Sequence, residues 1–599
     1  MAERFASRRN IDFLLNEVFN VDSLVDYPYY QDHSRETLNL VIDTAWKIAT
    51  DVMYPCFKEM DENPPQWIDG QVKVNPIVKD YLKECGQGGW INAHMSNEFG
   101  GQQLPNMLRF VTGFIFSAAN YSLSVYPMLT AGAANLIAAF GSKEMQEAYL
   151  EKMFAGEWQG TMALTEPDVG SSLSDLTTQA IPTGEGYYLI KGKKIFISAG
   201  THEAVDNVVH LMLARIQGAP AGVKGISLFV VPKQRITAGG GLENNDLTCD
   251  GIEHKLGYRG CPICQLTMGE NGDCRGYLVG EANKGLAYMF AMMNEERINV
   301  GIGATSKTTA AYYAALEYCQ QRLQGRKLSD KDPQSPQVPI IQHPDIKRML
   351  LFQRAVAEGS LSLALQLSKY LDLIAVGEDK EKYELLVDVL VPIVKTYPSE
   401  MGILATSMAI QCLGGYGYCS DFPVGQYYRD IRIDPIHEGT TGIQGQDLLG
   451  RKVTMKKGEA YKLYLEEVNK SIEEARGIEE TKTYALRLSE ALKVLQKVTM
   501  SLLTLAGQGK IEDFLADATL YLEMFGIIAI AWQWLIQAIA VEKALKESPT
   551  ATDINFYLGK AYTCGYFFEY ELPKIEGLAH RLLSEDKLTV AIQEEYFED

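Results

Sequence analysis

The segments HEGTTGIQ at 437–444 and QCLGGYG at 411–417 restrict the fold and function of this chain more than any others. Their glycines permit close approach of the backbone to a ligand, because glycine has no side chain. Glu438 precedes a glycine in a loop or at a helix start, where its side chain can reach into a cavity. Taken alone, however, this glutamate is more simply explained as a helix-capping carboxylate.

A second segment, ALTEPDVGS at 163–171, lies where the chain changes from a helical to a sheet-like pattern. The hydroxyls of Thr165 and Ser171, a glycine and free backbone amides suit hydrogen bonds to a flavin edge and to phosphate oxygens. The same residues also describe an ordinary turn or helix start. The segment by itself does not decide between these interpretations.

A third segment, KIFISAG at 194–200, carries an aromatic residue and, two positions later, a hydroxyl. Side chains alternate along a strand, so Phe196 and Ser198 are expected on one face. Such a face can lie against a planar redox ring. Taken alone, the simpler interpretation is a surface strand that ends at a glycine turn.

The pattern along the chain predicts an α+β protein of four domains. Residues 1–160 are expected to form an N-terminal helical domain, because apolar residues recur with a period of about 3.6 near its start and a long apolar run follows. Short apolar segments between Gly, Asn and Asp turns predict an antiparallel β-sandwich or barrel over 161–281. Helical patterns then predict a four-helix bundle over 282–455 and an extra helical domain over 456–599.

Two segments interrupt this regular pattern. The polar stretch 327–337, which contains Pro333 and Pro336, is predicted to be a loop within the bundle. Met524–Ala540 is the most apolar stretch, but it carries two glutamines and falls slightly short of a bilayer span of about 20 residues. We expect it to be a buried or interface helix rather than a membrane span.

The length of 599 residues predicts two to four domains, and the net charge of −20 argues against nucleic acid as a partner. No apolar run follows the arginines of the first ten residues, so we expect no secretory signal and a cytoplasmic location. Cys261 and Cys264 form a lone CxxC pair whose surroundings lack the usual pair-of-pairs spacing of zinc sites. We therefore expect no metal.

Together, in this order, the three segments resemble the acyl-CoA dehydrogenase family over roughly residues 35–450. Further segments, GIEHKLG at 251–257, GYLVG at 276–280 and MMNEER at 292–297, resemble the roughly 600-residue bacterial branch that includes methylthiopropanoyl-CoA dehydrogenases. That branch carries an extra C-terminal helical domain, which the segment after residue 460 would supply.

The resemblance implies a role for each matching position. Glu438 is similar to the catalytic base of the family, and Arg297 to the arginine that supports it. His437 and Asn294 are implied as contacts to the substrate. The implied contacts to the cofactor FAD are Thr165, Ser171, Phe196, Ser198, Arg322, Gln411, Gly414, Gly415 and Thr440, with Arg322 reaching across a subunit interface.

The sequence departs from the family pattern at three places. His437 occupies a position often held by Tyr, directly beside Glu438, where it either shapes the acyl pocket and the proton affinity of the base or simply packs. Asp168 replaces a small residue and adds negative charge near phosphates. The insert at 327–337 weakens the assignment of Arg322.

The resemblance implies desaturation of an acyl-CoA thioester between its alpha and beta carbons. Glu438 takes the alpha proton, the beta hydrogen leaves as hydride to flavin N5, and electrons pass to an electron-transfer flavoprotein. A homodimer is expected, because the extra domain occupies a surface used for tetramer contacts. The alternatives are an acyl-CoA oxidase that uses oxygen and, from another class, a flavin-bearing DNA-binding or damage-response protein.

Overall fold

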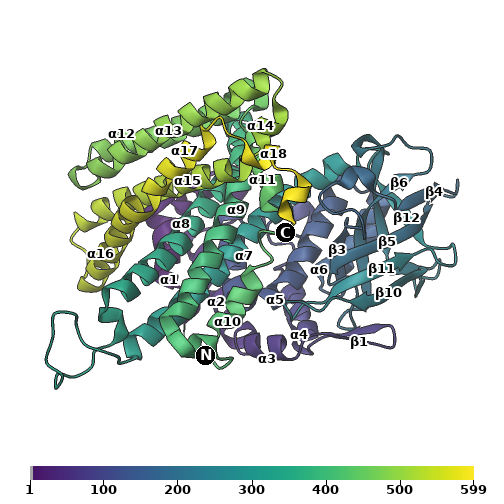
Figure 1. Ribbon diagram of the computed structural model, residues 1–599. Helices are drawn as coiled ribbons and strands as arrows, with labels where there is room; N and C mark the ends of the chain where they lie inside the picture. The colour runs from purple at the N-terminus through teal and green to yellow at the C-terminus, as the bar shows by residue number, and fades with distance from the viewer. Residues whose placement is uncertain (1–3, 599) are drawn as a thin grey trace. The chain divides into compact units, whose positions relative to one another are not determined.

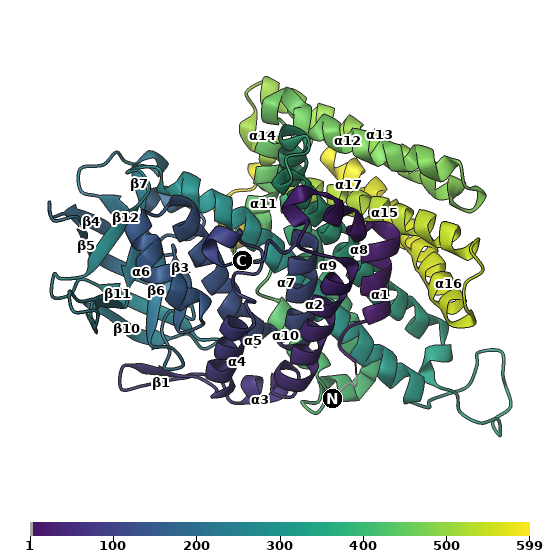
Figure 2. The ribbon, with the colours of Figure 1, turned by 180° about the vertical axis from the view of Figure 1, so that it is seen from behind.

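The computed structural model describes residues 4–598 (Figures 1 and 2). They form two compact units: a sheet unit, Asn39–Glu296, and a bundle unit, which joins the segment through Leu38 to the chain from Arg297 onward. The boundary falls inside one long helix, α7 (Gly285–Gln321).

The sheet unit begins with helices and continues into strands. Its helices are most of α2 (Arg35–Ile48), from Asn39 onward, and α3 (Phe57–Glu62), α4 (Ile77–Gln87), α5 (Asn106–Phe140) and α6 (Lys143–Phe154). A small hairpin, β1 (Gln66–Ile68) and β2 (Gln71–Lys73), interrupts the helical region predicted for residues 1–160. The remaining strands are β3 (Trp158–Ala163), β4 (Gln179–Pro182), β5 (Tyr188–Ser198), β6 (Asn207–Ile216), β7 (Ile226–Pro232), β8 (Gln234–Ile236), β9 (Leu242–Asn244), β10 (Leu247–Ile252), β11 (Ile263–Met268) and β12 (Arg275–Val279).

Five strands close into a ring in the order β5, β12, β7, β6, β4 and back to β5. The C-terminal half of β5 leaves the ring and pairs with β11, which pairs with β10. Most pairs are antiparallel, as predicted, but β3 and β4 run parallel to β6. The long connection from β3 through β5 to β6 supplies the crossover that parallel neighbours require.

One hydrophobic core joins this ring to the helices before it. Apolar residues of α5, α6, β3, β6 and β7 are packed together with Met289 and Met292 of α7. Gly160 lies at the closest approach, because a Cβ there would meet Ala133 and Met153. The sheet is therefore anchored to α5 and α6.

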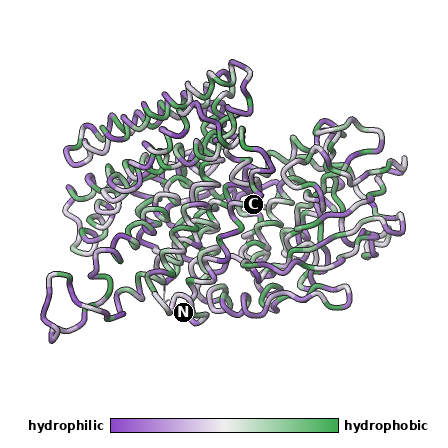
Figure 3. The backbone as a smooth tube through the Cα atoms, viewed as in Figure 1, coloured by the Kyte–Doolittle hydropathy of each residue, from purple (hydrophilic) through white to green (hydrophobic). Residues whose placement is uncertain are grey.

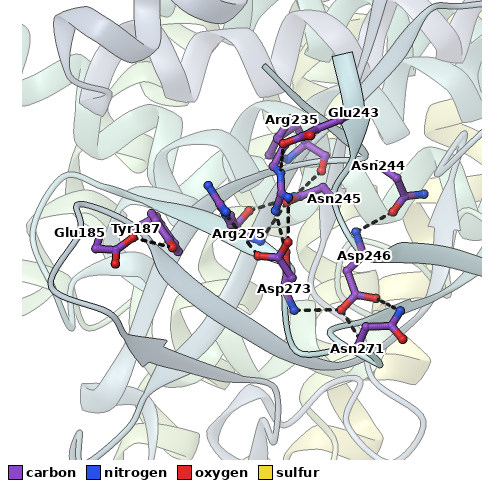
Figure 4. Close-up of polar contacts among 11 residues, drawn as sticks. Glu185, Tyr187, Arg235, Glu243, Asn244, Asn245, Asp246, Asn271, Asp273 and Arg275 are labelled. Carbon is purple, nitrogen blue, oxygen red and sulfur yellow. Dashed lines mark hydrogen bonds and ion pairs between the residues drawn. The ribbon is translucent and has the colours of Figure 1, made fainter. Parts of the chain in front are cut away.

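A polar network on the surface fixes the β8–β9 hairpin to β12 (Figure 4). Arg235 forms ion pairs with Glu243 at 2.6 Å and with Asp273 at 2.7 Å. The Asn245 side chain donates to the carbonyl of Arg275 at 2.9 Å and accepts from its amide at 2.9 Å. These residues pair with one another, so the network explains the hairpin rather than a ligand site.

The bundle unit contains α1 and the helices from α7 onward. Three long helices, α7, α8 and α9, and two short ones, α10 and α11, occupy the region predicted as a four-helix bundle. The later helices form the extra C-terminal layer, with α12 and α13 side by side in both views (Figures 1 and 2). The bounds are α1 (Arg8–Asp12), α8 (Pro344–Ala375), α9 (Lys380–Leu413), α10 (Val424–Ile431), α11 (Thr441–Asp447), α12 (Met455–Arg476), α13 (Lys482–Gly507), α14 (Ile511–Leu515), α15 (Ala518–Leu545), α16 (Ala551–Tyr566), α17 (Ile575–Leu582) and α18 (Leu588–Ala591).

Helix α15 is the core of the C-terminal layer. It packs on α8, α9, α11, α12, α13 and α16, and the Trp534 indole donates to the carbonyl of Ala355 in α8 at 3.1 Å. Gly359 of α8 allows this approach, because a Cβ there would meet Ile530 and Trp534. By contrast, α12 and α13 alternate between apolar and polar residues, as amphipathic helices do (Figure 3).

Two helical stretches of the described chain, 106–140 and 511–545, are long and apolar enough to cross a membrane by length and composition alone. Within the protein, 72% and 94% of their most apolar windows are buried. Met524–Ala540 lies in the second stretch and is buried, as expected. Both stretches therefore serve as core helices in this fold.

The division into units differs from the predicted domain boundaries at the N-terminus. The first residues group with the bundle unit rather than with the rest of the N-terminal helical region. Arg9 pairs with Asp553 of α16 at 3.1 Å, and the Phe13 ring meets the Phe556 ring edge-on at 5.4 Å. These contacts, between residues more than 500 positions apart, are invisible to local sequence patterns.

We expect Trp534→Ala to lower the free energy of unfolding by about 3–5 kcal/mol, since it removes a fully buried ring and leaves a cavity at the α8–α15 contact. Met500→Ala on α13 is the control, because the Met500 side chain is 64% exposed. Chemical denaturation of both variants measures the difference. Equal stability of the two variants would contradict the assignment of α15 as the core.

Candidate functional site

Glu438 lies in a left-handed turn rather than at a helix cap. Its φ is +54°, and that of Gly439 is +88°. A left-handed conformation costs a non-glycine residue about 1–3 kcal/mol, so surrounding contacts must impose it. Thr440, not Glu438, is the N-cap of α11, because its hydroxyl accepts from the amide of Ile443 at 3.2 Å. The capping interpretation of Glu438 is therefore wrong.

Two side chains from different helices hold the backbone of this turn. Gln444 of α11 donates its amide N–H to the carbonyl of Glu438 at 3.1 Å. Lys395 of α9 donates to the next carbonyl, that of Gly439, at 2.8 Å. Gly439 is required there, because a Cβ would lie 2.6 Å from the Gln444 side-chain nitrogen.

A buried ion pair with α7 holds the segment that precedes the turn. The Lys307 ammonium lies 3.0 Å from Asp434, and both side chains are almost completely buried. Asp434 also lies 3.5 Å from His437, whose ring is one-third exposed. His437 is thus tied to the backbone segment before Glu438 while part of its ring stays accessible.

Arg297 lies nearby in the same unit, buried at 3% exposure. It donates to Asp447 at 3.3 Å. Burial lowers the pKa of Arg297, while the carboxylates of Asp447 and Glu438 act to raise it. The sequence-predicted pair of Arg297 and Glu438 is therefore close enough to interact electrostatically.

A second group of predicted residues surrounds a cavity of about 480 Å³ at the ends of α7 and α9. Arg322, Gln411, Gly414 and Gly415 all line it. Nothing lies within 4 Å of the position a Cβ would take at Gly414 or Gly415, so the backbone faces open space. The structure thus brings together four of the residues implied as contacts to FAD.

The 327–337 insert does not displace Arg322. Residues 327–337 form a projecting loop (teal in Figure 1), and its stem is closed by backbone hydrogen bonds. The amide of Ile340 donates to the carbonyl of Arg322 at 2.8 Å. The insert therefore leaves the end of α7 in place.

In the sheet unit, the second and third predicted segments are neighbours. The amide of Ile195 in β5 donates to the carbonyl of Thr165 at 3.0 Å. Phe196 has a left-handed φ of +58° and is 59% exposed, which is unusual for a phenylalanine in a strand. Ser198 is half-buried and Ser171 exposed.

A buried ion pair fixes these two segments to each other. Lys194 lies 2.9 Å from Glu166, and Glu166 also accepts from the amides of Thr177 at 2.7 Å and Thr178 at 3.0 Å. Burial acts to raise the pKa of Glu166, but Lys194 and the hydrogen bonds outweigh it and lower this pKa to about 2. Burial lowers the pKa of Lys194 to about 8.

Sequence reasoning assigned no role to four charged residues of these sites: Glu166, Lys194, Lys307 and Lys395. One signal was present for Lys395, because it is a lone lysine in an otherwise apolar run of α9. A charged residue in such a run is buried only when it is paired or hydrogen-bonded. The partners of Lys395 and Lys307 lie far along the chain and could not be identified without the structure.

The remaining predicted residues fall in one unit or the other. Asn294 lies in the part of α7 that belongs to the sheet unit, whereas His437 and Thr440 lie in the bundle unit. Cys261 and Cys264 are both buried free thiols. Within residues 4–598, no group of three or more His, Cys, Asp or Glu side chains is placed to hold a metal ion.

Four family models match this chain in succession. Their descriptions are acyl-CoA dehydrogenase, N-terminal domain (36–157), middle domain (161–270) and C-terminal domain (283–452), and acetyl-CoA dehydrogenase C-terminal like (464–593). Together they span nearly the whole described chain.

Named relatives match over the same length. A 3-methylmercaptopropionyl-CoA dehydrogenase of Ruegeria pomeroyi is 38% identical, over 93% of this chain and 95% of its own. A butyryl-CoA dehydrogenase of Syntrophomonas wolfei is 33% identical, over 98% of both chains. The crystal structure of an acyl-CoA dehydrogenase complexed with FAD from Bacillus anthracis shares the fold, with a TM-score of 0.74 and 20% identity over 97% of this chain and 93% of its own.

Glu166→Ala is expected to lower the free energy of unfolding near neutral pH by about 3–5 kcal/mol, because it leaves the Lys194 ammonium buried without its carboxylate. The pKa of Glu166 is lowered by folding from 4.5 to about 2, so its contribution is complete above 4.5 and is lost as the pH falls towards 2. The stability gap between wild type and variant should therefore narrow in acid. Denaturation curves at several pH values measure it, with Glu270→Ala, an exposed position, as control. A gap independent of pH would count against the ion pair.

Proposed function

Because this chain belongs to the acyl-CoA dehydrogenase family of flavoproteins, we propose that it desaturates an acyl-CoA thioester to the 2-enoyl-CoA, with Glu438 as the base. The observation that carries the proposal is the left-handed turn at Glu438, where side chains hold the carbonyls of Glu438 and Gly439. Such strain is retained where a side chain must be aimed at a reacting group.

In this mechanism Glu438 removes the proton alpha to the thioester carbonyl. An alpha C–H is a poor acid in water, so donors aimed at the thioester oxygen must stabilise the negative charge that develops there in a site without water. The fixed backbone of 438–439 holds the carboxylate in one position through the proton transfer. Arg297 supports the carboxylate electrostatically, and His437 and Asn294 contact the substrate.

FAD, when bound, supplies the acceptor for the beta hydride. Two features suit it: the cavity with open glycine backbone at Gly414 and Gly415, and the exposed ring of Phe196. The guanidinium group of Arg322, which lines the cavity, is suited to bind a phosphate group or the edge of a ring. The residues that would hold FAD are Thr165, Ser171, Phe196, Ser198, Arg322, Gln411, Gly414, Gly415 and Thr440.

The proposal extends to the partners of the enzyme. The electron acceptor is an electron-transfer flavoprotein, and the assembly is a homodimer in which Arg322 reaches the FAD of the other subunit. Relatives named for butyryl-CoA and 3-methylmercaptopropionyl-CoA indicate which thioesters to test first.

We expect Glu438→Gln to retain FAD. The rate at which substrate bleaches its flavin should be roughly 10²–10⁴-fold lower, as is typical when a general base is removed. Stopped-flow absorbance with butyryl-CoA and 3-methylmercaptopropionyl-CoA measures this. Glu473→Gln on α12 is a matched control, because its side chain is 66% exposed. Full turnover by Glu438→Gln would remove the base assignment.

A dehydrogenase should turn over only when an electron-transfer flavoprotein or an artificial acceptor is supplied. We expect little oxygen consumption with acyl-CoA alone, and an oxygen electrode measures it directly. Rapid peroxide formation without an added acceptor would instead establish an acyl-CoA oxidase.

A further inference from the structure

Lys395 is a buried lysine behind the turn that carries Glu438. It lies on α9 between Pro392 and Pro398, and it is completely buried. Its ammonium donates to the carbonyl of Gly439, 44 residues further along the chain, at 2.8 Å. Burying the charged ammonium of a long, flexible side chain costs free energy, so packing alone does not explain the buried position of Lys395.

Charged groups from several elements surround this ammonium. Burial lowers the pKa of Lys395 to about 8, and the carboxylates of Asp434, Glu438 and Glu400 counteract that effect, whereas Arg297 adds to it. Asp434 already pairs with Lys307 from α7. Glu400 accepts from the Thr441 hydroxyl. Lys395 is therefore the cation that faces the Glu438 turn from α9, as Arg297 and Lys307 do from α7.

Two residues together support the turn. Gln444 fixes the carbonyl of Glu438, and Lys395 fixes the carbonyl of Gly439. Gln444 thereby holds the peptide unit between Glu438 and Gly439, and Lys395 holds the next one, between Gly439 and Thr440. Together the two contacts restrict the backbone of the turn in which Glu438 has its left-handed φ.

We propose that Lys395 is a positioning residue for Glu438: its ammonium locks the Gly439 carbonyl and supplies a positive charge behind the carboxylate. The proposal rests on the proposed function of Glu438 as base. Lys395 itself touches neither substrate nor cofactor in this mechanism. Removing it should loosen the turn while leaving the binding residues in place.

The test compares Lys395→Met, which keeps most of the side-chain length without the ammonium, with Lys395→Gln, which is shorter and uncharged. Each should bleach the flavin at least tenfold more slowly with substrate, because a small misplacement of a catalytic group costs up to about 10²-fold. FAD content and KM for the acyl-CoA should stay within about threefold of wild type.

Lys369→Met is the matched control. Lys369 of α8 is a partly buried lysine that, like Lys395, donates to a backbone carbonyl, but to that of Phe19, at 2.9 Å. Its variant should bleach at the wild-type rate. A merely structural lysine would lower the melting temperature without lowering kcat at unchanged KM.

A wild-type bleaching rate in either Lys395 variant that folds and retains FAD would overturn the proposal. A rate lowered only in proportion to a loss of FAD or a rise in KM would also overturn it, since Lys395 would then act on binding rather than on the position of Glu438. If Lys395→Met does not fold, the bleaching rate of Lys395→Gln decides whether the proposal holds. Glu438→Gln, measured in parallel, separates the two hypotheses: turnover by that variant refutes the base, whereas its inactivity with fully active Lys395 variants refutes only the positioning role.

Discussion

A buried ammonium group is stable only where oxygen atoms surround it, and four of the buried lysines in the described chain join parts that are distant in sequence. Lys194 joins β5 to the loop after β3 through Glu166, and Lys307 joins α7 to Asp434. Lys395 joins α9 to the Glu438 turn. Lys560 of α16 joins Glu358 of α8 to Asn10 of the N-terminal segment.

Two of these contacts lie beside residues that we propose to act in the reaction. A left-handed glutamate is unfavourable by itself, and Gln444 and Lys395 hold the carbonyls of the turn at 438–439. Likewise, the exposed ring of Phe196 stands on a strand whose neighbouring residue, Lys194, is locked by Glu166. The buried charges thus fix the backbone next to residues that we propose to contact a ligand.

Much of this arrangement was predictable from the sequence. The order of helical, sheet and helical regions, the glycine segments and the exposed insert all appear in local patterns, because periodicity and turn residues act over short distances. The parallel pairs on β6 and the docking of the N-terminal segment on α16 were missed. Both depend on contacts between residues far apart in the chain.

The sequence by itself determined the family, the candidate base Glu438 and the residues that accompany it. Only the tertiary structure decided the backbone setting of Glu438. Thr440 is the N-cap of the helix, and Glu438 is a strained residue in a turn whose carbonyls are held by side chains. The physical reason is that one of the two carbonyls of this turn is bound by Lys395, which lies 44 residues away in the chain. No local pattern around 437–444 contains that contact.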